Sequence, residues 1–193
     1  IDRETITVLS VIAHAVGIAI NNTKASSSVL WEAIHDDLTG LHNRRYFNDR
    51  LIDEVDRAKR YGGSISLLLA DIDYFKKVND TYGHSVGDAV LVWLGSMLRN
   101  KLRKTDLVAR YGGEEFAIIL HNADQAKSFE IAENLRRAVQ ESVLPDDESV
   151  AITISIGIST LGEDAGSFQG VMNRADKALY MAKSMGRNRV CRI

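Results

Sequence analysis

Carboxylates gather at two places in the sequence where strands are expected to end. Asp71 and Asp73 close the apolar run "SISLLLADID", and Glu114 and Glu115 follow two glycines in "RYGGEEF". Side chains two residues apart on a strand point to the same face, so Asp71 and Asp73 are expected to point together. If the two segments pair, several carboxylates converge and repel one another. A hard divalent cation, which prefers oxygen ligands and often shares them with phosphates, relieves that repulsion.

Each of these acids also has a simpler interpretation. A single carboxylate at a strand end is usually just solvated, and a Gly-Gly pair is ordinary in a tight hairpin. We favour a metal site for the set as a whole. For Gly112 and Gly113 we predict positive φ angles in the turn, together with room for a ligand to approach the backbone.

Cationic and amide side chains near these acids suggest a phosphorylated ligand with a base. "YFKKVND" after Asp73 predicts a short helix whose first N–H groups can bind phosphate, with Lys76 adding charge. Lys183 and Arg187 share a helix face only if their helix continues past Gly186. Asn79, His84 and Asp88 form a polar set that can read guanine. Each residue alone is equally compatible with a solvated surface or helix-end position.

The surrounding pattern predicts the elements that position these groups. Helices are expected from about Asn43 to Tyr61, Ser85 to Lys101, Ala123 to Glu141 and Ser167 to Ser184. Strands are expected in the run ending at Asp71, in a hairpin turning at Gly112-Gly113, in "SVAITISIGIST" and in "NRVCRI". Pro145 marks a loop. The alternation predicts an α/β (α+β) fold in which helices flank a mixed central sheet.

Composition narrows the class of protein further. The 193 residues carry a net charge of -2, so no bulk attraction to nucleic acid or to a membrane is implied. The single cysteine, Cys191, excludes an internal disulfide and fits a reducing compartment. No apolar run reaches the 18 residues of a membrane span. We expect a cytoplasmic fragment of a longer protein, and membrane attachment of that protein is left open.

Four segments together resemble one family, the GGDEF diguanylate cyclases: "DDLTGLHNRRYF", "DIDYFKKVNDTYGHSVGD", "RYGGEEF" and "ADKALYMAKSMGRNR". The resemblance covers residues 36–193, which we interpret as the catalytic domain. It implies a fold similar to class III nucleotide cyclases and the polymerase palm. It also implies a reaction, in which two GTP are condensed into cyclic di-GMP with release of two pyrophosphates by a homodimer.

The resemblance also implies roles for individual residues. Asp71, the Ile72 carbonyl, Glu114 and Glu115 are expected to hold Mg²⁺ or Mn²⁺, and Glu114 also to help deprotonate the attacking 3′-hydroxyl. Lys76 is expected to stabilise charge on the transferring phosphate. The substrate contacts implied are Tyr74, Phe75, Lys76, Asn79, His84, Asp88, Gly112, Gly113, Lys183 and Arg187. Arg103 and Asp106 in "RKTD" match the RxxD site, at which the product inhibits the enzyme.

Residues 1–35 are expected to form an N-terminal helix. "ITVLSVIAHAVGIAINNTK" resembles the end of a GAF domain running into a signalling helix that pairs two copies; a helix packed on its own domain is the alternative. Two other functions remain open. One is a GGDEF domain that binds GTP or cyclic di-GMP without catalysis, although its acids are retained. The other is a dimerisation module. A P-loop GTPase is disfavoured because GxxxxGK[ST] does not occur.

Overall fold

The computed structural model describes residues 31–144, 150–161 and 166–193. The chain divides into two compact units, Ile1–His35 and Asp36–Ile193. In the first unit only Trp31–His35 is described. It contains a helical turn, with the rings of Trp31 and His35 stacked 3.5 Å apart. The rest of the expected N-terminal helix, and Pro145, lie outside the described residues.

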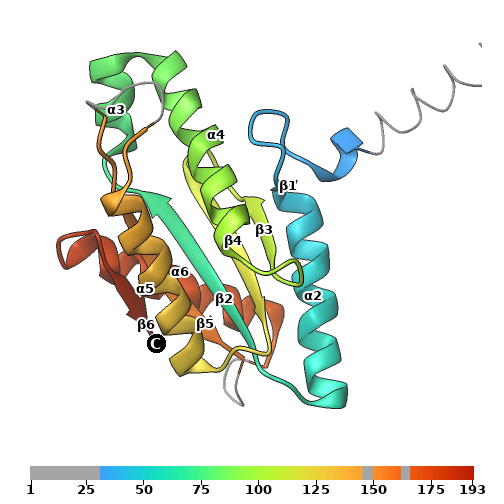
Figure 1. Ribbon diagram of the computed structural model, residues 1–193. Coiled ribbons are helices and arrows are strands. Elements are labelled where there is room, and N and C mark those ends of the chain that lie inside the picture. The colour runs from blue at the N-terminus through green and yellow to red at the C-terminus, as the bar shows by residue number, and fades with distance from the viewer. Residues whose placement is uncertain (1–30, 145–149, 162–165) are drawn as a thin grey trace, which may run out of the picture. The chain divides into compact units, whose positions relative to one another are not determined.

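The second unit is a six-stranded mixed sheet with helices on both faces, as predicted (Figure 1). The strand order is β1-β3-β4-β2-β5-β6, with β1–β3 and β5–β6 parallel and the other pairs antiparallel. The strands are β1 (His42–Asn43), β2 (Ile65–Ile72), β3 (Leu107–Arg110), β4 (Glu115–His121), β5 (Ile154–Thr160) and β6 (Val190–Arg192), and the helices are α2 (Arg44–Tyr61), α3 (Phe75–Tyr82), α4 (His84–Lys101), α5 (Gln125–Glu141) and α6 (Phe168–Ser184).

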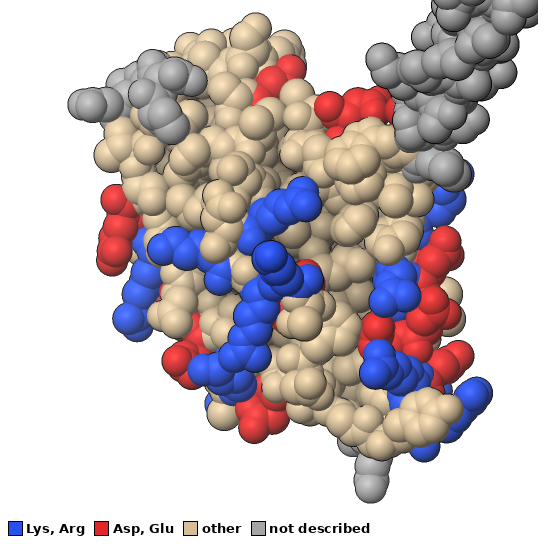
Figure 2. All heavy atoms as spheres, turned by 45° about the vertical axis from the view of Figure 1, so that its right-hand side comes forward, with Lys and Arg blue, Asp and Glu red and all other residues tan. Residues whose placement is uncertain are grey.

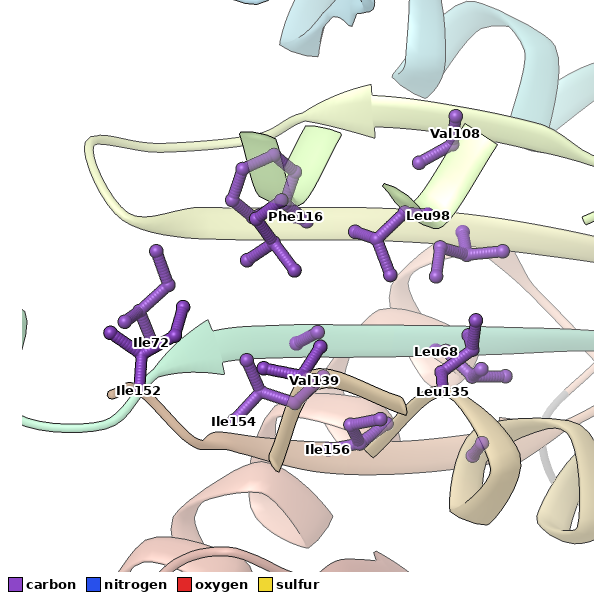
Figure 3. Close-up of a cluster of buried hydrophobic side chains, with 14 of the residues drawn as sticks. Leu68, Ile72, Leu98, Val108, Phe116, Leu135, Val139, Ile152, Ile154 and Ile156 are labelled. Atoms are coloured by element: carbon purple, nitrogen blue, oxygen red, sulfur yellow. The ribbon is translucent and has the colours of Figure 1, made fainter. Parts of the chain in front are cut away.

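Strand β2 lies in the middle of the molecule, and all eight of its residues are buried. Its alternate side chains enter two separate cores. Leu68, Ala70 and Ile72 pack with side chains of α3, α4 and α5, as Figure 3 shows for Leu98, Leu135 and Val139. Leu67 and Leu69 pack with α2 and α6 on the opposite face. A continuous apolar run is typical of a strand that is covered on both sides.

Local signals place the helix starts correctly. The side chains of Asn43 and Ser167 accept hydrogen bonds from the backbone N–H groups of Tyr46 and Gly170, each at 3.0 Å, so both residues cap their helices. Two strands differ from expectation. The strand expected over residues 149–160 begins only at Ile154, and the two-residue strand β1 was not predicted. A two-residue strand is too short to produce a periodic pattern.

The surface of the molecule agrees with its near-neutral charge. On the face drawn in Figure 2, Lys and Arg side chains are interspersed with Asp and Glu side chains, without one broad field of a single sign. Within the described ranges, no helix is both long enough and apolar enough to cross a membrane. Any anionic ligand must therefore be held by a local arrangement of residues.

Candidate active site

The predicted convergence of carboxylates is produced by the pairing of β2 with β4. Asp71 lies opposite Glu115 in this antiparallel pair and opposite Ser155 of β5 on its other side. The backbone N–H of Ile72 donates a 3.3 Å hydrogen bond to the carbonyl of Glu114. The expectation that the hairpin lies beside the Asp71 strand is therefore confirmed, and both signature glutamates lie at the end of β2.

Asp71 and Glu114 are held where their charge is unfavourable. Asp71 is 5% exposed, and burial raises its pKa; a hydrogen bond from Lys183 and the charge of that lysine act against the rise. Burial also raises the pKa of Glu114, and the negative charge of Asp71 raises it further. Lys183 Nζ lies 2.8 Å from Asp71 Oδ2. Two desolvated carboxylates with one flexible lysine form a site that favours additional positive charge.

This donor set fits a hard metal ion. Aspartate, glutamate and a backbone carbonyl are oxygen ligands of the kind that Mg²⁺ takes together with substrate phosphates. Among the described residues, no three His, Cys, Asp or Glu side chains are gathered into a metal cluster. The proposed metal ligands include only two such side chains, those of Asp71 and Glu114, because the third ligand is the backbone carbonyl of Ile72. A metal contact by Glu115 stays a prediction.

Asp73 lies near Asp71, but its oxygens already have donors. Thr153 Oγ1 and Ser155 Oγ donate to it at 2.7 and 2.6 Å, and the backbone N–H of Asn188 donates at 2.9 Å. Of the groups that act on the pKa of Asp71, Asp73 has the smallest effect. We therefore regard Asp73 as a buried anchor of the strand end and not as a further metal ligand.

The two hairpin glycines have a different purpose from the one predicted. Neither Gly112 nor Gly113 has a positive φ, so the expectation of left-handed turn residues is wrong. The loop from Tyr111 to Glu114 is long enough to reverse the chain without them. A Cβ on Gly112 would lie 2.5 Å from Glu115 Oε2, whereas one on Gly113 would meet nothing within 4 Å. Gly112 makes room for Glu115, and Gly113 leaves open space at the tip.

The hairpin tip is braced by an ion pair to the start of the domain. Arg110 donates through Nε and NH2 to the carbonyl of Gly113, at 3.2 and 2.8 Å, and through NH1 to both oxygens of Asp36 at 3.3 Å. Thr39 donates to Asp36 from its backbone and its hydroxyl. Burial opposes ionisation of Asp36, but these hydrogen bonds and the Arg110 charge together lower its pKa.

Asp36→Asn should therefore destabilise the domain in a pH-dependent way. Because the folded-state pKa of Asp36 is lowered, its contribution is present above the unfolded pKa and is lost as pH falls through the folded value. We expect a loss of about 1–2 kcal/mol at pH 7 that shrinks below about pH 4. Urea unfolding across pH measures it. The exposed neighbour Asp37 provides the control Asp37→Asn, and an equal effect there would contradict the brace.

The predicted phosphate cradle begins at a left-handed residue. Tyr74 has φ +58°, precedes the first residue of α3 and is 62% exposed. In the described part of the chain, no side chain caps this helix. Lys76 lies in its first turn and is exposed. The N–H groups at the start of α3 and the Lys76 ammonium are thus both available to an anion.

The residues expected to read guanine lie on the pair of helices α3 and α4. Asn79 Oδ1 is buried and has no hydrogen-bond partner among the described residues. His84 and Asp88 are exposed one turn apart at the start of α4, as expected. A Cβ on Gly87 would overlap Asn79 Oδ1, so with glycine here the Asn79 side chain packs directly against α4. Sequence reasoning missed Gly87, and its only signal was a glycine inside a helical pattern.

Lys183 and Arg187 are positioned by different parts of the chain, Lys183 by α6 and Arg187 by the loop that follows it. Helix α6 ends at Ser184, and Gly186 and Arg187 have φ values of +112° and +63°. The condition that the helix continues past Gly186 is therefore not met, and the two residues do not share a helix face. Lys183 contacts Asp71, whereas the Arg187 guanidinium lies 4.4 Å from the centre of the Tyr74 ring.

The "RKTD" residues lie at the opposite end of the hairpin from Glu115. Asp106 accepts hydrogen bonds from the backbone N–H groups of Arg103 and His121, at 3.2 and 3.3 Å. No ion pair joins Arg103 to Asp106 in the described structure. The surface cavity beside Arg103 measures about 480 Å³ and is lined also by Arg50, Arg57 and His121.

Known proteins are similar to this chain in sequence and in fold. Residues 33–189 match the family described as "Diguanylate cyclase, GGDEF domain". Diguanylate cyclase A of Treponema denticola is 40% identical over 183 residues, covering 93% of this chain and 48% of that protein. Response regulator PleD of Caulobacter vibrioides is 44% identical over 161 residues, covering 82% and 36%. The chain thus spans half or less of the length of these relatives.

Solved structures agree with this similarity. The coiled coil and GGDEF domain of DgcB from Caulobacter crescentus, in complex with c-di-GMP, has a TM-score of 0.85 at 33% identity, covering 96% of this chain and 98% of that one. The GGDEF domain of PA1120 from Pseudomonas aeruginosa has a TM-score of 0.75 at 36% identity, covering 80% and 99%. The expected fold is therefore confirmed by structures at substantial identity.

Proposed function

The chain belongs to the GGDEF family of diguanylate cyclases, and from this we propose that the protein containing it joins two GTP molecules into cyclic di-GMP. The observation that carries the proposal is the pair of desolvated carboxylates, Asp71 and Glu114, at the end of β2 with Lys183 beside them. Members of this family are metal-dependent. For this chain we propose Mg²⁺ or Mn²⁺, held by Asp71, the Ile72 carbonyl and Glu114, with Glu115 assisting.

The residues support an in-line displacement at the α-phosphorus of GTP. Glu114 accepts the proton of a 3′-hydroxyl, the 3′-oxygen forms a bond to the α-phosphorus, and the bond to pyrophosphate breaks. A bound divalent ion supplies charge stabilisation to the phosphate oxygens. Lys76 stabilises the charge on the transferring phosphate. The backbone of Tyr74, Phe75 and Lys76 cradles the phosphates, with the open tip at Gly112 and Gly113 facing the ligand.

Two further groups bind the ends of the nucleotide. Lys183 and Arg187 contact the γ-phosphate. A metal ion held by Asp71 would free the Lys183 ammonium, which now pairs with that carboxylate, for this contact. Asn79 and Asp88 accept hydrogen bonds from guanine, with His84 beside them. Asn79 Oδ1 is buried against Gly87, so the Asn79 amide turns away from α4 when it accepts from the base. This arrangement supports GTP as the substrate.

The product requires two copies of the chain. Cyclic di-GMP contains two identical halves, and one site binds one GTP, so each 3′-hydroxyl must attack the nucleotide on the partner. We propose a homodimer in which two sites face each other and residues 1–35 act as a dimerisation helix that orients residues 36–193. The division of the chain after His35 supports these bounds. We propose the cytoplasm, where GTP is available, as the location of this part of the protein.

Product inhibition is proposed at Arg103 and Asp106. Arginine suits both phosphate and guanine edges, and the cavity beside Arg103 has two more arginines in its lining. Structures of the GGDEF domain of DgcB with c-di-GMP support product binding in relatives. Asp106 is held by hydrogen bonds from the backbone N–H groups of Arg103 and His121, which fix its carboxylate beside this cavity.

The direct test is to incubate the purified chain with GTP and Mg²⁺ and to separate the products. Cyclic di-GMP and pyrophosphate should appear in a ratio of one to two. The specific activity should fall on dilution, because two copies must meet. Tight GTP binding without product would indicate a receptor instead, and full activity in a monomeric variant would contradict the shared-site mechanism.

Asp88→Ser should weaken the preference for GTP. A carboxylate accepts from the N1–H and N2–H₂ groups of guanine, and adenine lacks both donors, so the hydroxyl removes the basis of discrimination. We expect the preference for GTP over ATP to fall by about 10–100-fold. Product analysis with equal GTP and ATP measures this, and Asp80→Ser, an exposed acid on α3, is the control. An unchanged product would refute the role of Asp88.

A further inference from the structure

Asp73 is a buried acid for which the proposed reaction has no use. It is 5% exposed, and its three hydrogen-bond donors are the hydroxyls of Thr153 and Ser155 and the backbone N–H of Asn188. The described residues offer it no ion pair. A buried carboxylate that depends on neutral donors is costly to disturb. Asp73 therefore fixes the backbone at Asn188, 115 residues along the chain.

The loop that contains Asn188 has an unfavourable backbone conformation. Gly186, Arg187 and Asn188 have φ values of +112°, +63° and +45°. Left-handed conformations cost energy for residues other than glycine and persist only when surrounding contacts enforce them. Arg187 N–H donates to the Ala182 carbonyl at 3.0 Å, which closes the end of α6. The conformation of Asn188 needs contacts from elsewhere in the fold.

Arg136 of α5 supplies such a contact through the Asn188 side chain. Its NH1 donates to Asn188 Oδ1 at 2.7 Å and to Gln140 at 2.6 Å, and its Nε and NH2 donate to Glu133 at 3.2 and 3.1 Å. The Arg136 side chain is 13% exposed. A guanidinium held on three sides is a rigid donor. Asn188 is thus held by Asp73 at its backbone and by Arg136 at its side chain.

We propose that Arg136 is a positioning residue for the γ-phosphate of GTP, acting through Asn188 on Arg187. The Arg187 guanidinium lies 4.4 Å from the centre of the Tyr74 ring, and Tyr74 opens the phosphate cradle directly after Asp73. The contacts from Arg136 to Asn188 and from Asn188 to Asp73 thus connect α5 to Arg187 and to the residue that precedes Tyr74. The inference rests on the proposed function, since it assigns Arg187 to the γ-phosphate as that function does.

The test compares Arg136→Gln with Arg137→Gln in the full chain. Arg137 is adjacent on α5 and also contacts Glu133, at 3.6 Å, but it is 63% exposed and serves as a matched control. Misplacing Arg187 should raise the KM for GTP by about tenfold, with a smaller change in kcat. Because GDP lacks the γ-phosphate, its affinity should be unchanged, so the ratio of GDP to GTP dissociation constants falls. Arg137→Gln should change none of these quantities.

A second variant covers the case in which Arg136→Gln destabilises the protein. Asn188→Ala keeps the N–H donor to Asp73 and the cost of a left-handed backbone but removes the acceptor for Arg136. It should lower the GTP preference over GDP as Arg136→Gln does. An unchanged ratio in both variants, or an equal loss in Arg137→Gln, would overturn the inference. Failure of the wild-type chain to bind GTP would instead remove the proposed function, and this inference with it.

Discussion

Glu114→Gln should abolish cyclic di-GMP formation, with kcat lower by about 10³-fold or more. The substitution keeps the size of the side chain but removes both the proton acceptor and a negatively charged metal ligand. Glu114 lies at the end of β2, where its backbone carbonyl accepts from Ile72 N–H. Two other carboxylates nearby already have partners. Asp73 accepts from three donors and Asp71 pairs with Lys183, so neither is free to replace Glu114 as proton acceptor.

Loss of activity must be separated from loss of the fold. Burial and the Asp71 charge raise the pKa of Glu114, so ionised Glu114 is less favourable in the folded than in the unfolded chain. Because the folded-state pKa is raised, ionisation of this group reduces stability once the pH rises above the unfolded-state pKa. Glu114→Gln should therefore leave the midpoint of thermal unfolding unchanged or slightly higher. A variant that unfolds earlier would contradict this account of the site.

The adjacent Glu115→Gln is the graded comparison. Glu115 lies against Gly112 and opposite Asp71. Because we propose that it only assists in holding the metal ion, Glu115→Gln should lower kcat by about tenfold, less than Glu114→Gln does. Product formation, with GTP binding measured separately in a non-turnover assay, distinguishes the two variants. If Glu114→Gln kept more than about a tenth of the wild-type kcat, the role of Glu114 as proton acceptor and metal ligand would be wrong.

Gly157→Ala should strongly destabilise the domain. Gly157 lies in β5 under α6, and a Cβ there would overlap the Ala175 carbonyl oxygen and the Leu179 nitrogen, and would lie 2.7 Å from Leu179 Cα. These are backbone atoms of α6, so no side chain can turn away to make room. The helix would have to move away from the sheet. We expect a loss of about 3 kcal/mol in the free energy of unfolding.

The expected loss corresponds to a fall of about 6–12 °C in the midpoint of thermal unfolding for a domain of this size. Gly113→Ala is the control, because a Cβ there meets nothing within 4 Å and the residue has no positive φ. Its stability should be unchanged. Since α6 also carries Lys183, Gly157→Ala should reduce activity as well. Equal stability of the two alanine variants would mean that β5 and α6 are not packed as described.

The sequence alone determined most of the secondary structure and predicted the chemistry of the site. The apolar run to Ile72 and the caps Asn43 and Ser167 are local signals, and each acts within a few residues of the chain. Four motifs identified the family, and the resemblance implied GTP as substrate and a metal ion as cofactor. The sequence left the pairing of the hairpin with the Asp71 strand as a condition for the carboxylates to converge, and the register of β2 and β4 meets that condition.

Only the tertiary structure decided how distant residues meet. The ion pair between Asp71 and Lys183, the brace from Asp36 to Arg110, and the contact from Arg136 to Asn188 join segments that are 112, 74 and 52 residues apart. The need for glycine at Gly157 arises where β5 meets α6, and the left-handed turn at Arg187 arises where α6 ends. These features depend on which elements pack together, and periodicity and capping, being local, contain no information about packing partners.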